Sequence, residues 1–239
     1  MERTVETQKK RSMALEIWRR LRKNKMAMLG LVILVMLALT AIFADVIADY
    51  DTKVIAQDIK NRLQGPSMEH WCGTDEFGRD IFARLVHGSR VSLVVGLISV
   101  SISLLMGGAF GAIAGYYGGR VDNVIMRIMD IFLAVPSILL AMTIVAALGT
   151  SLINVMLAIG VSGIPGYARI VRASVMSIKD QEFVEASRAI GAKSPTTIFR
   201  EILPNCLAPI IVQATLSVAG AILSTASLSF IGLGVQPPS

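Results

Sequence analysis

Few residues of this chain have the types and spacing that carry out covalent chemistry. The 239 residues include two cysteines, Cys72 and Cys206, and two histidines, His70 and His87. Their spacing fits no metal-ligand pattern, and two cysteines cannot form a disulfide framework. The sequence holds no Ser-His-Asp set, no His-Glu-x-x-His motif and no paired carboxylates in a plausible pocket. It therefore predicts no catalytic centre, no metal site and no cofactor.

The tripeptide Ala-Lys-Ser at 192–194 is a partial likeness to a phosphate-binding loop. That loop needs a glycine directly before the lysine and another glycine five residues earlier. Position 192 is alanine, and no soluble strand precedes it. We therefore interpret the likeness as chance and do not expect this chain to bind ATP.

The composition indicates a membrane protein. Hydrophobic residues make up 54% of the chain, and the mean hydropathy is +0.64. The net charge of +6 is concentrated near the N-terminus, where nine basic residues precede residue 26 and abut the first apolar run. This arrangement is the positive-inside pattern and predicts a cytoplasmic N-terminus. No aromatic platform accompanies the charges, so we do not expect nucleic acid as a partner.

Uncharged runs long enough to span a membrane define the fold class. Because lipid offers no partner to an open strand, each run is expected to be a helix, and the chain is predicted to be an all-α membrane protein. A cleaved signal peptide is the alternative for the first run, but its 19 uncharged residues from Met26 to Ala44 exceed the ~7–15 of a signal core. The five expected spans are 26–47, 91–117, 128–148, 152–168 and 207–234.

Charge and alternation predict one topology. A cytoplasmic basic segment, 1–25, precedes the first transmembrane helix, and 48–90 forms an extracytoplasmic loop in which acids match or outnumber bases. A core of 91–239 follows, with a basic cytoplasmic loop at 169–206. This topology separates the two cysteines by the membrane and excludes a disulfide. The chain then stops outside, so it has five spans or lacks a final returning helix.

The middles of the spans contain no Asp, Glu, Lys, Arg or His. An ion-coupled carrier needs such groups to bind its ion, so any active transport must draw its energy from another source. The second span has glycines at four-residue spacing, which we interpret as a surface for packing another helix. They are Gly107, Gly111, Gly115 and Gly119. Pro136 is expected to kink the third span, and Pro165-Gly166 to close the fourth.

The charged stretch EASRAIGAKSPTTIFREILPN, residues 185–205, predicts a helix, a turn and a second helix. Asp180 can cap the first helix, Gly191 can end it, and Ser194-Pro195 can start the second. Apolar residues recur along the first helix at helical spacing, at Phe183, Ala186 and Ile190. Such a helix pair is suited to a groove in a partner protein, and a helix lying on the lipid surface is the alternative.

The same stretch resembles a known motif. Glu185-Ala186-Ser187, Gly191 and Leu203-Pro204 are similar to the Glu-Ala-Ala loop of binding-protein-dependent ABC importer permeases, with Ser187 in place of the second alanine and Glu201 in place of isoleucine. Further stretches resemble the dipeptide, oligopeptide and nickel branch of these permeases, so the likeness covers essentially the whole chain. They are WCGTDEFGRDIFARLVHGSRVSLVVGL (71–97), GYYGGRVDNVIMRIMDIFLAVPSILLAM (115–142) and LSFIGLGVQPPS (228–239).

The resemblance implies a type I ABC importer transmembrane bundle in the cytoplasmic (inner) membrane, with a sixth span expected but missing. It implies a second permease subunit in a heterodimer, two ATP-binding subunits that hydrolyse ATP, and an extracytoplasmic substrate-binding protein. This chain would then be a transport subunit in membrane lipid and not an enzyme. The residues expected to couple it to the ATPase are Phe183, Glu185, Ala186, Ser187, Gly191, Leu203 and Pro204.

The expected cargo is a dipeptide or oligopeptide, and nickel or another small solute is the alternative within the branch. Two other classes make different predictions. An ion-coupled carrier or channel would transport without ATPase partners, and a membrane scaffold would use 180–205 only to bind lipid.

Overall fold

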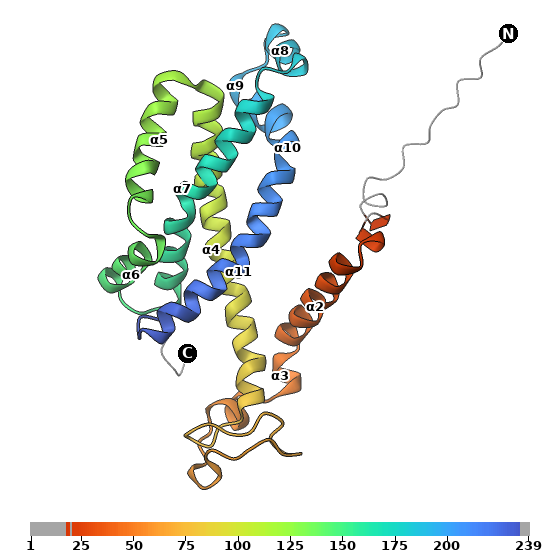
Figure 1. Cartoon of the computed structure of the whole chain (residues 1–239), viewed down its shortest axis with the longest axis vertical. Helices are drawn as coiled ribbons and strands as arrows, with labels where there is room; N and C mark the ends of the chain where they lie inside the picture. The colour runs from red at the N-terminus through yellow and green to blue at the C-terminus, as the bar shows by residue number, and fades with distance from the viewer. Residues whose placement is uncertain (1–17, 20, 235–239) are drawn as a thin grey trace, which may run out of the picture. The chain divides into compact units, whose positions relative to one another are not determined.

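The computed structural model describes residues 18, 19 and 21–234, so most of the basic segment 1–25 and the end of the chain from 235 lie outside the described residues. Within the described part the regular structure is helical, apart from one isolated β-bridge between Thr74 and Asp80. The chain divides into two compact units, Met1–Arg90 and Val91–Ser239 (Figure 1). Each unit is described separately.

The first unit contains the apolar helix α2 (Lys25–Ile42) and the short helix α3 (Ala44–Ile47). Asn24 caps α2, and its side-chain oxygen accepts hydrogen bonds from the amides of Met26 and Ala27. Most side chains of α2 are exposed, as expected for a helix that is surrounded by lipid. The single span predicted over 26–47 is therefore interrupted at Phe43.

Residues 48–80 contain only two short helical turns, η1 (Tyr50–Ile55) and η2 (Ile59–Asn61). The helix α4 (Ile81–Tyr117) then starts ten residues before the predicted span. Its first turn is capped by the Asp80 carboxylate, which accepts a hydrogen bond from the Ala83 amide at 3.0 Å. The predicted start at residue 91 marked where the charged residues end and the chain can enter lipid. The helix itself starts earlier, because its cap and its packing stabilise turns outside the lipid.

The first turns of α4 are tied to the preceding helices by polar side chains. The His87 imidazole bonds to the carbonyl oxygen of Ala48 at 2.8 Å, and Arg90 donates to that of Ala41 at 2.8 Å. Arg90 also pairs with Asp45 at 3.0 Å. These bonds hold α3 against the start of α4.

The second unit is built around α7 (Leu152–Ile178), which crosses its middle (Figure 1). It also contains α5 (Gly119–Leu133), α6 (Ser137–Leu148) and α11 (Leu207–Phe230). One face of α7 carries the residues that enter the main hydrophobic cluster, among them Val155, Met156 and Ile159. Residues of α7 enter all three hydrophobic clusters of the unit, so the other helices pack around α7.

One prediction about proline is confirmed by the structure, and another is wrong. The third span, predicted over 128–148 with a kink at Pro136, is sharply bent there, and α5 and α6 meet at 82° at a break that contains Pro136. The fourth span was predicted to close at Pro165-Gly166, but α7 continues through Pro165 to Ile178. Both prolines lack an amide donor. Pro165 is fully buried among neighbouring helices, and such packing allows a membrane helix to continue through proline.

Glycines allow α4 to approach α7 closely. A methyl group added at Gly107 would collide with the carbonyl oxygen of Ile164, and one added at Gly111 would collide with that of Ala168. At Gly115 the added carbon would lie 2.9 Å from the carbonyl oxygen of Arg172. Gly119 differs, because nothing lies within 4 Å of its added carbon and it occupies the turn after α4 with φ +52°.

Two serines of α4 add hydrogen bonds along the same contact. The Ser99 hydroxyl donates to the carbonyl oxygen of Met156 at 3.0 Å, and the Ser103 hydroxyl donates to that of Gly160 at 2.6 Å. Small residues and hydroxyls across a helix pair are typical of association in lipid, where no hydrophobic effect draws helices together.

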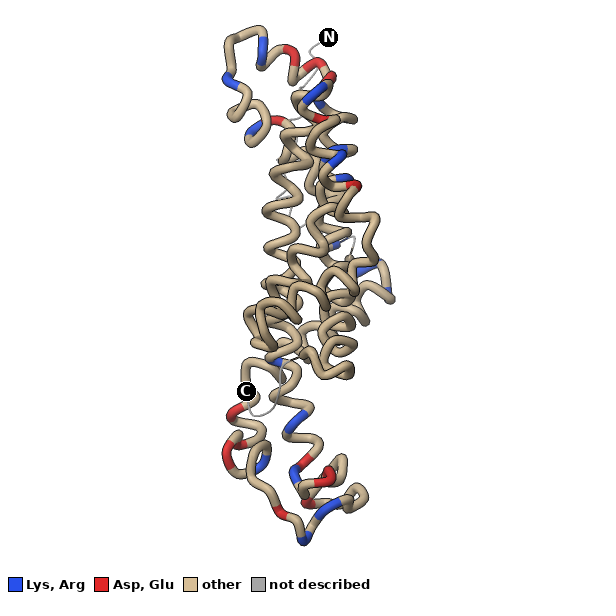
Figure 2. Tube along the Cα trace, turned by 90° about the vertical axis from the view of Figure 1, so that its left-hand side faces the viewer, with Lys and Arg blue, Asp and Glu red and all other residues tan. Residues whose placement is uncertain are grey.

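Ion pairs join α5 to α7. Arg172 donates two hydrogen bonds to the nearly buried carboxylate of Asp122, at 2.5 and 2.6 Å. Asp130 and Arg169 form a second, exposed pair at 2.9 Å. The remaining charges of this unit gather mainly at the end that carries α8 (Figure 2).

Four described helices are long and apolar enough to cross a membrane, and the number is five if the bent pair α5–α6 counts as one span. The five predicted spans therefore correspond to helices of the structure only when that broken pair is counted as one.

We expect Gly111→Ala to lower the midpoint of thermal unfolding of the detergent-purified protein. The added methyl group meets the α7 backbone, and overpacking of this kind costs about 1–3 kcal/mol. Gly108→Ala is the matched control, because nothing lies within 4 Å of an added carbon there. The control should be neutral or stabilising, since alanine favours a helix. Equal shifts in the two variants would contradict the close approach.

We expect Asp122→Asn to destabilise the protein by about 1–3 kcal/mol, because it leaves the Arg172 guanidinium without its charged partner in a partly buried site. Asp130→Asn removes the exposed pair and should change stability by less than about 1 kcal/mol. Thermal unfolding of the two variants in the same detergent compares them. A larger loss of stability in Asp130→Asn than in Asp122→Asn would contradict the prediction that the buried ion pair contributes more to stability than the exposed pair.

Candidate functional site

A short charged helix, α8 (Glu182–Ala189), follows the end of α7. Gln181 occupies its N-cap without a side-chain hydrogen bond, so the predicted capping by Asp180 is wrong. Gly191 follows the helix with φ +85°, a conformation that glycine adopts without strain. The amide of Ala192 then bonds to the carbonyl oxygen of Ser187 at 3.1 Å, which closes the turn.

The second helix of the predicted pair is composite. It consists of α9 (Ser194–Thr196), the π-helical turn η3 (Thr197–Ile202) and α10 (Leu203–Asn205). Lys193 occupies the N-cap position, and Ser194 was wrongly predicted to hold it. Pro204 has no amide to bond to the carbonyl four residues earlier, and the widened turn η3 immediately precedes this region. The predicted helix-turn-helix plan is present, with a less regular second half.

One buried side chain anchors α8 to the helices of the second unit. Val184 is fully buried and belongs to a hydrophobic cluster that joins α8 to α4, α7, η3 and α11. The cluster contains Ala112, Val171, Val175, Val184, Ile198, Ile202, Cys206 and Ile210. A displacement of α8 would therefore act on the ends of both α4 and α7.

A second attachment is polar. The Arg188 guanidinium carbon lies 4.9 Å from the centre of the Tyr116 ring, near the end of α4. This is the geometry of a cation–π contact. The Tyr116 hydroxyl also lies near the side chains of Ser194 and Thr197. Tyr116 thus connects α4 to both halves of the helix-turn-helix.

The opposite face of α8 is uncovered within the described part of the chain. Phe183 and Ala186 are exposed, and Ile190 is 86% exposed. Phe199 of η3 is 70% exposed at the same end of the unit. These four exposed apolar residues form an outward surface, which we call the α8 face: Phe183, Ala186, Ile190 and Phe199.

The predicted site residues fall into two groups. Phe183, Glu185 and Ala186 are exposed, and Glu185 forms no ion pair with any described residue. Ser187 and Leu203 are half-buried, and Leu203 packs against the cluster that holds Val184. Gly191 is exposed at a turn, and Pro204 is exposed within α10. The predicted set thus contains both outward-facing and anchoring positions.

Sequence reasoning missed Val184, Arg188 and Tyr116. Val184 and Arg188 are four residues apart and therefore lie on the same face of α8. The sequence could have shown this face if both faces of the helix had been considered as contact surfaces. Tyr116 could not be found in this way, because its distance along the chain from Arg188 gives no indication of contact.

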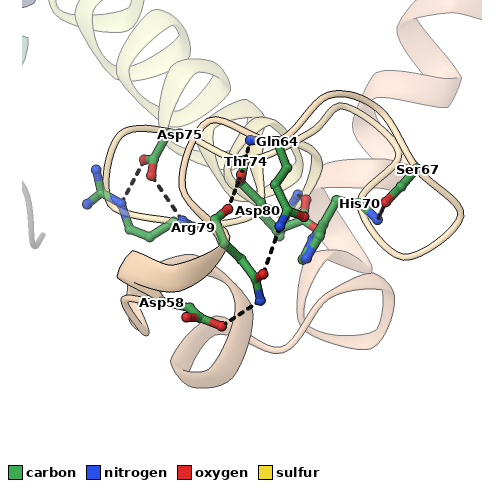
Figure 3. A network of polar contacts seen from close by, with 10 residues as sticks. Asp58, Gln64, Ser67, His70, Thr74, Asp75, Arg79 and Asp80 are labelled. Atoms are coloured by element: carbon green, nitrogen blue, oxygen red, sulfur yellow. Dashed lines mark hydrogen bonds and ion pairs between the residues drawn. The ribbon is translucent and has the colours of Figure 1, made fainter.

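The segment 48–80 of the first unit forms a polar network (Figure 3). Asp58 accepts hydrogen bonds from the Lys60 amide and the Asn61 side chain, and Asn61 accepts one from Gln64 at 2.7 Å. The Thr74 hydroxyl accepts a bond from the Gln64 amide at 2.9 Å. These bonds give a segment with little helix a defined conformation.

Two aspartates in this segment are held in their charged form. Burial alone would raise the pKa of Asp75, but hydrogen bonds from the amides of Arg79 and Phe77 and from the Arg79 side chain lower it below its ordinary value. The pKa of Asp80 is lowered in the same way, against burial, by His70 at 3.0 Å and by the Ala83 amide. Trp71 and Met68 project from this segment with large exposed surfaces.

No group of three or more His, Cys, Asp or Glu side chains in the described ranges is arranged to hold a metal ion. Cys72 and Cys206 are free thiols, the first exposed and the second buried.

Comparison with known proteins identifies the family. The model of the binding-protein-dependent transport system inner membrane component matches residues 107–239, and that of the N-terminal transmembrane domain of oligopeptide transport permease C matches residues 12–66. The dipeptide transport system permease protein DppC of Alkalihalophilus pseudofirmus is 51% identical, over 93% of this chain and 73% of the relative. The di/tripeptide permease DppC of Pseudomonas aeruginosa is 46% identical, over 94% and 75%.

A solved structure of the methionine ABC transporter MetNI in an inward-facing conformation agrees in fold. It is 25% identical in sequence and covers 63% of this chain and 76% of that chain, with a TM-score of 0.53. One conclusion follows from the two matching family models, the relatives that match more than nine tenths of this chain, and the helical bundle. The chain belongs to the inner membrane components of binding-protein-dependent ABC transport systems, and it is a multi-pass permease of the cytoplasmic membrane.

Proposed function

We propose that this permease forms part of the path by which short peptides enter the cell. The named relatives at 51% and 46% identity are permeases for dipeptides and for di- and tripeptides. A third, the glutathione transport system permease GsiD of Shigella dysenteriae, is 43% identical over 94% of this chain and 74% of the relative, and glutathione is itself peptide-like. These relatives support a peptide as cargo and give no support to nickel.

The α8 face is the observation that supports ATP-driven transport. The chain has no phosphate-binding loop, and it leaves Phe183, Ala186 and Ile190 exposed on a helix whose other face is anchored to α4 and α7. An apolar helix face of this kind fits a groove in a partner protein. We propose that the partner is the ATP-binding subunit and that this permease is a transport subunit, without enzymatic activity of its own.

A lipid surface explains the same face less well. The first turn of α8 carries Glu182 and Glu185, and acidic side chains are repelled by the anionic lipids of a cytoplasmic leaflet. In a protein groove, these carboxylates can meet basic side chains. The acidic first turn therefore favours a protein partner over membrane lipid.

The anchoring contacts define how force would be transmitted. If the ATP-binding subunits move together, they displace α8, and Val184 and Arg188 carry the displacement to the ends of α7 and α4. The bundle then switches between inward-facing and outward-facing shapes. Such coupling is effective because the cluster around Val184 is packed and cannot absorb the movement by local rearrangement.

The proposed topology places 1–25 and the segment 169–206, which includes the end of α7, in the cytoplasm, and it places the segment 48–90, which includes the start of α4, outside. The network in 48–80 would then face the extracytoplasmic binding protein. We further propose that the core 91–239 pairs with a second, different permease subunit across a pseudo-twofold axis, so that the transporter holds two permeases and two ATP-binding subunits.

Glu185→Arg tests the α8 face. We expect the variant to insert and assemble but to lose peptide uptake by about tenfold or more, which corresponds to 1.4 kcal/mol or more of coupling free energy. Uptake and ATP hydrolysis are measured together in proteoliposomes that contain the complete transporter. Glu185→Asp keeps the charge and should retain uptake. Normal uptake in Glu185→Arg would remove the basis of the proposed contact.

Thiol labelling tests the topology. A membrane-impermeant maleimide should label Cys72 in intact cells, because this thiol is exposed and expected outside. Cys206 is buried, so its protection alone would not report sidedness. Phe199→Cys in a Cys72→Ser background, expressed without the ATP-binding subunits, provides an exposed reporter at the α8 end. It should react in inverted vesicles and stay unlabelled in intact cells, and the reverse pattern would overturn the topology.

A further inference from the structure

One edge of α11 is polar in a helix otherwise made mainly of alanine and branched aliphatic residues. The edge residues are spaced by four, three, four and three positions, which aligns them along one side of a helix. They are Gln213, Ser217, Gly220, Ser224 and Ser227. The four polar members are half-buried, and Gly220 is exposed, with open space where a side chain would lie.

The polar groups of this edge are not used up by the described residues. The Gln213 side-chain amide donates to the Ser217 hydroxyl at 3.2 Å. Its carbonyl oxygen accepts no hydrogen bond within the described ranges. An amide side chain in a membrane helix therefore retains an unused acceptor and a second unused donor proton.

Tyr167 of α7 points to the same place. Its side chain is 3% exposed, and its hydroxyl lies near that of Ser217. No geometrically sound hydrogen bond reaches this hydroxyl from any described residue. A buried hydroxyl without a partner is unfavourable, and native proteins rarely leave one. The Tyr167 hydroxyl thus lies beside Ser217, closed off from solvent in the described chain, with hydrogen-bonding capacity that the described residues do not fully use.

Three kinds of group could contact Tyr167, Gln213 and Ser217: lipid tails, a neighbouring helix or a short peptide. Their hydrogen-bonding capacity distinguishes them. Lipid tails offer no hydrogen bonds, so they would leave the Gln213 carbonyl oxygen and the Tyr167 hydroxyl unsatisfied. A packed neighbouring helix explains Gly220 and the serines, and its carbonyl oxygens can accept from hydroxyls, as those of α7 do from Ser99 and Ser103. Its backbone amides are already bonded, however, so they supply no donor to the carbonyl oxygen of Gln213. A short peptide presents an uncharged amide N–H and C=O in extended form. Gln213, Ser217 and Tyr167 together offer both a donor and an acceptor to such a unit, with no charge to hold it tightly.

We propose that Tyr167, Gln213 and Ser217 form a transient binding site for the peptide bond of the cargo on its way through the permease. This inference rests on the proposed peptide import and adds the residues that contact the cargo. Weak, uncharged hydrogen bonding suits a path, because a passing peptide must be released again. The binding protein collects the peptide, so loss of this site should slow transit and leave the half-saturating peptide concentration unchanged.

The test uses the complete transporter in proteoliposomes, with saturating binding protein and radiolabelled dialanine. Gln213→Leu and Tyr167→Phe should each lower the peptide transported per ATP hydrolysed by about three- to tenfold, the range of one lost hydrogen bond. The control is Thr215→Val, whose hydroxyl bonds to the Ile211 carbonyl oxygen on an exposed face of α11. Thr215→Val should leave the ratio unchanged.

A second measurement does not depend on a loss of rate. Ser217→Cys in a Cys72→Ser background should react with a small water-soluble thiol reagent in the assembled transporter, and dialanine with binding protein and ATP should slow the reaction at least about threefold. Leu216→Cys, on the neighbouring exposed face, should show no slowing by peptide.

The outcomes separate this inference from the proposed function. If the unmodified transporter imports no dialanine while it hydrolyses ATP, both fail. If it imports dialanine but Gln213→Leu and Tyr167→Phe keep the normal ratio, or peptide does not protect Ser217→Cys, the site is overturned while peptide import stands. Loss of subunit assembly in Gln213→Leu with a normal ratio in the remaining complex would identify the edge as a packing surface, and would also overturn it.

Discussion

The close approach of α4 to α7 is the constraint on which the rest of the second unit depends. Gly107 and Gly111 lie so near the α7 backbone that no side chain fits between, and Ser99 and Ser103 bond directly to α7 carbonyl oxygens. In lipid, this contact cannot rely on hydrophobic burial and needs close packing with hydrogen bonds. Because the two helices are held in register, their ends form one platform for the segment that follows.

That platform explains why a short helix can have a defined position. An isolated eight-residue helix is marginal in water, so α8 depends on its contacts. Val184 packs in a cluster shared with α4 and α7, and Arg188 lies over the Tyr116 ring. With one face held in this way, the other presents Phe183, Ala186 and Ile190 outward. The same packing that stabilises α8 would transmit its displacement to α4 and α7 under the proposed coupling.

Polarity within the second unit has two uses. Asp122 and Arg172 satisfy one another and join α5 to α7, so their charges contribute to the architecture. The hydroxyl of Tyr167 and the amide of Gln213 instead retain unused hydrogen-bonding capacity. Paired charges thus contribute to the architecture of the bundle, and the unpaired neutral groups are the ones that we propose contact the cargo.

The sequence by itself determined the helical class, because uncharged runs near the length of a bilayer can only be helices there. It also predicted the helix-turn-helix after α7, since Gly191 and Pro195 act through local backbone geometry. Local rules failed where neighbours decide. Pro165 was expected to end a helix that continues through it, whereas the kink expected at Pro136 is present as a bend of 82°. Only the tertiary structure showed which face of α8 is buried, which arginine meets Asp122, and that Tyr167 lies beside Ser217. Those facts depend on contacts between distant segments, and hydrophobic periodicity along one segment contains no information about its neighbours.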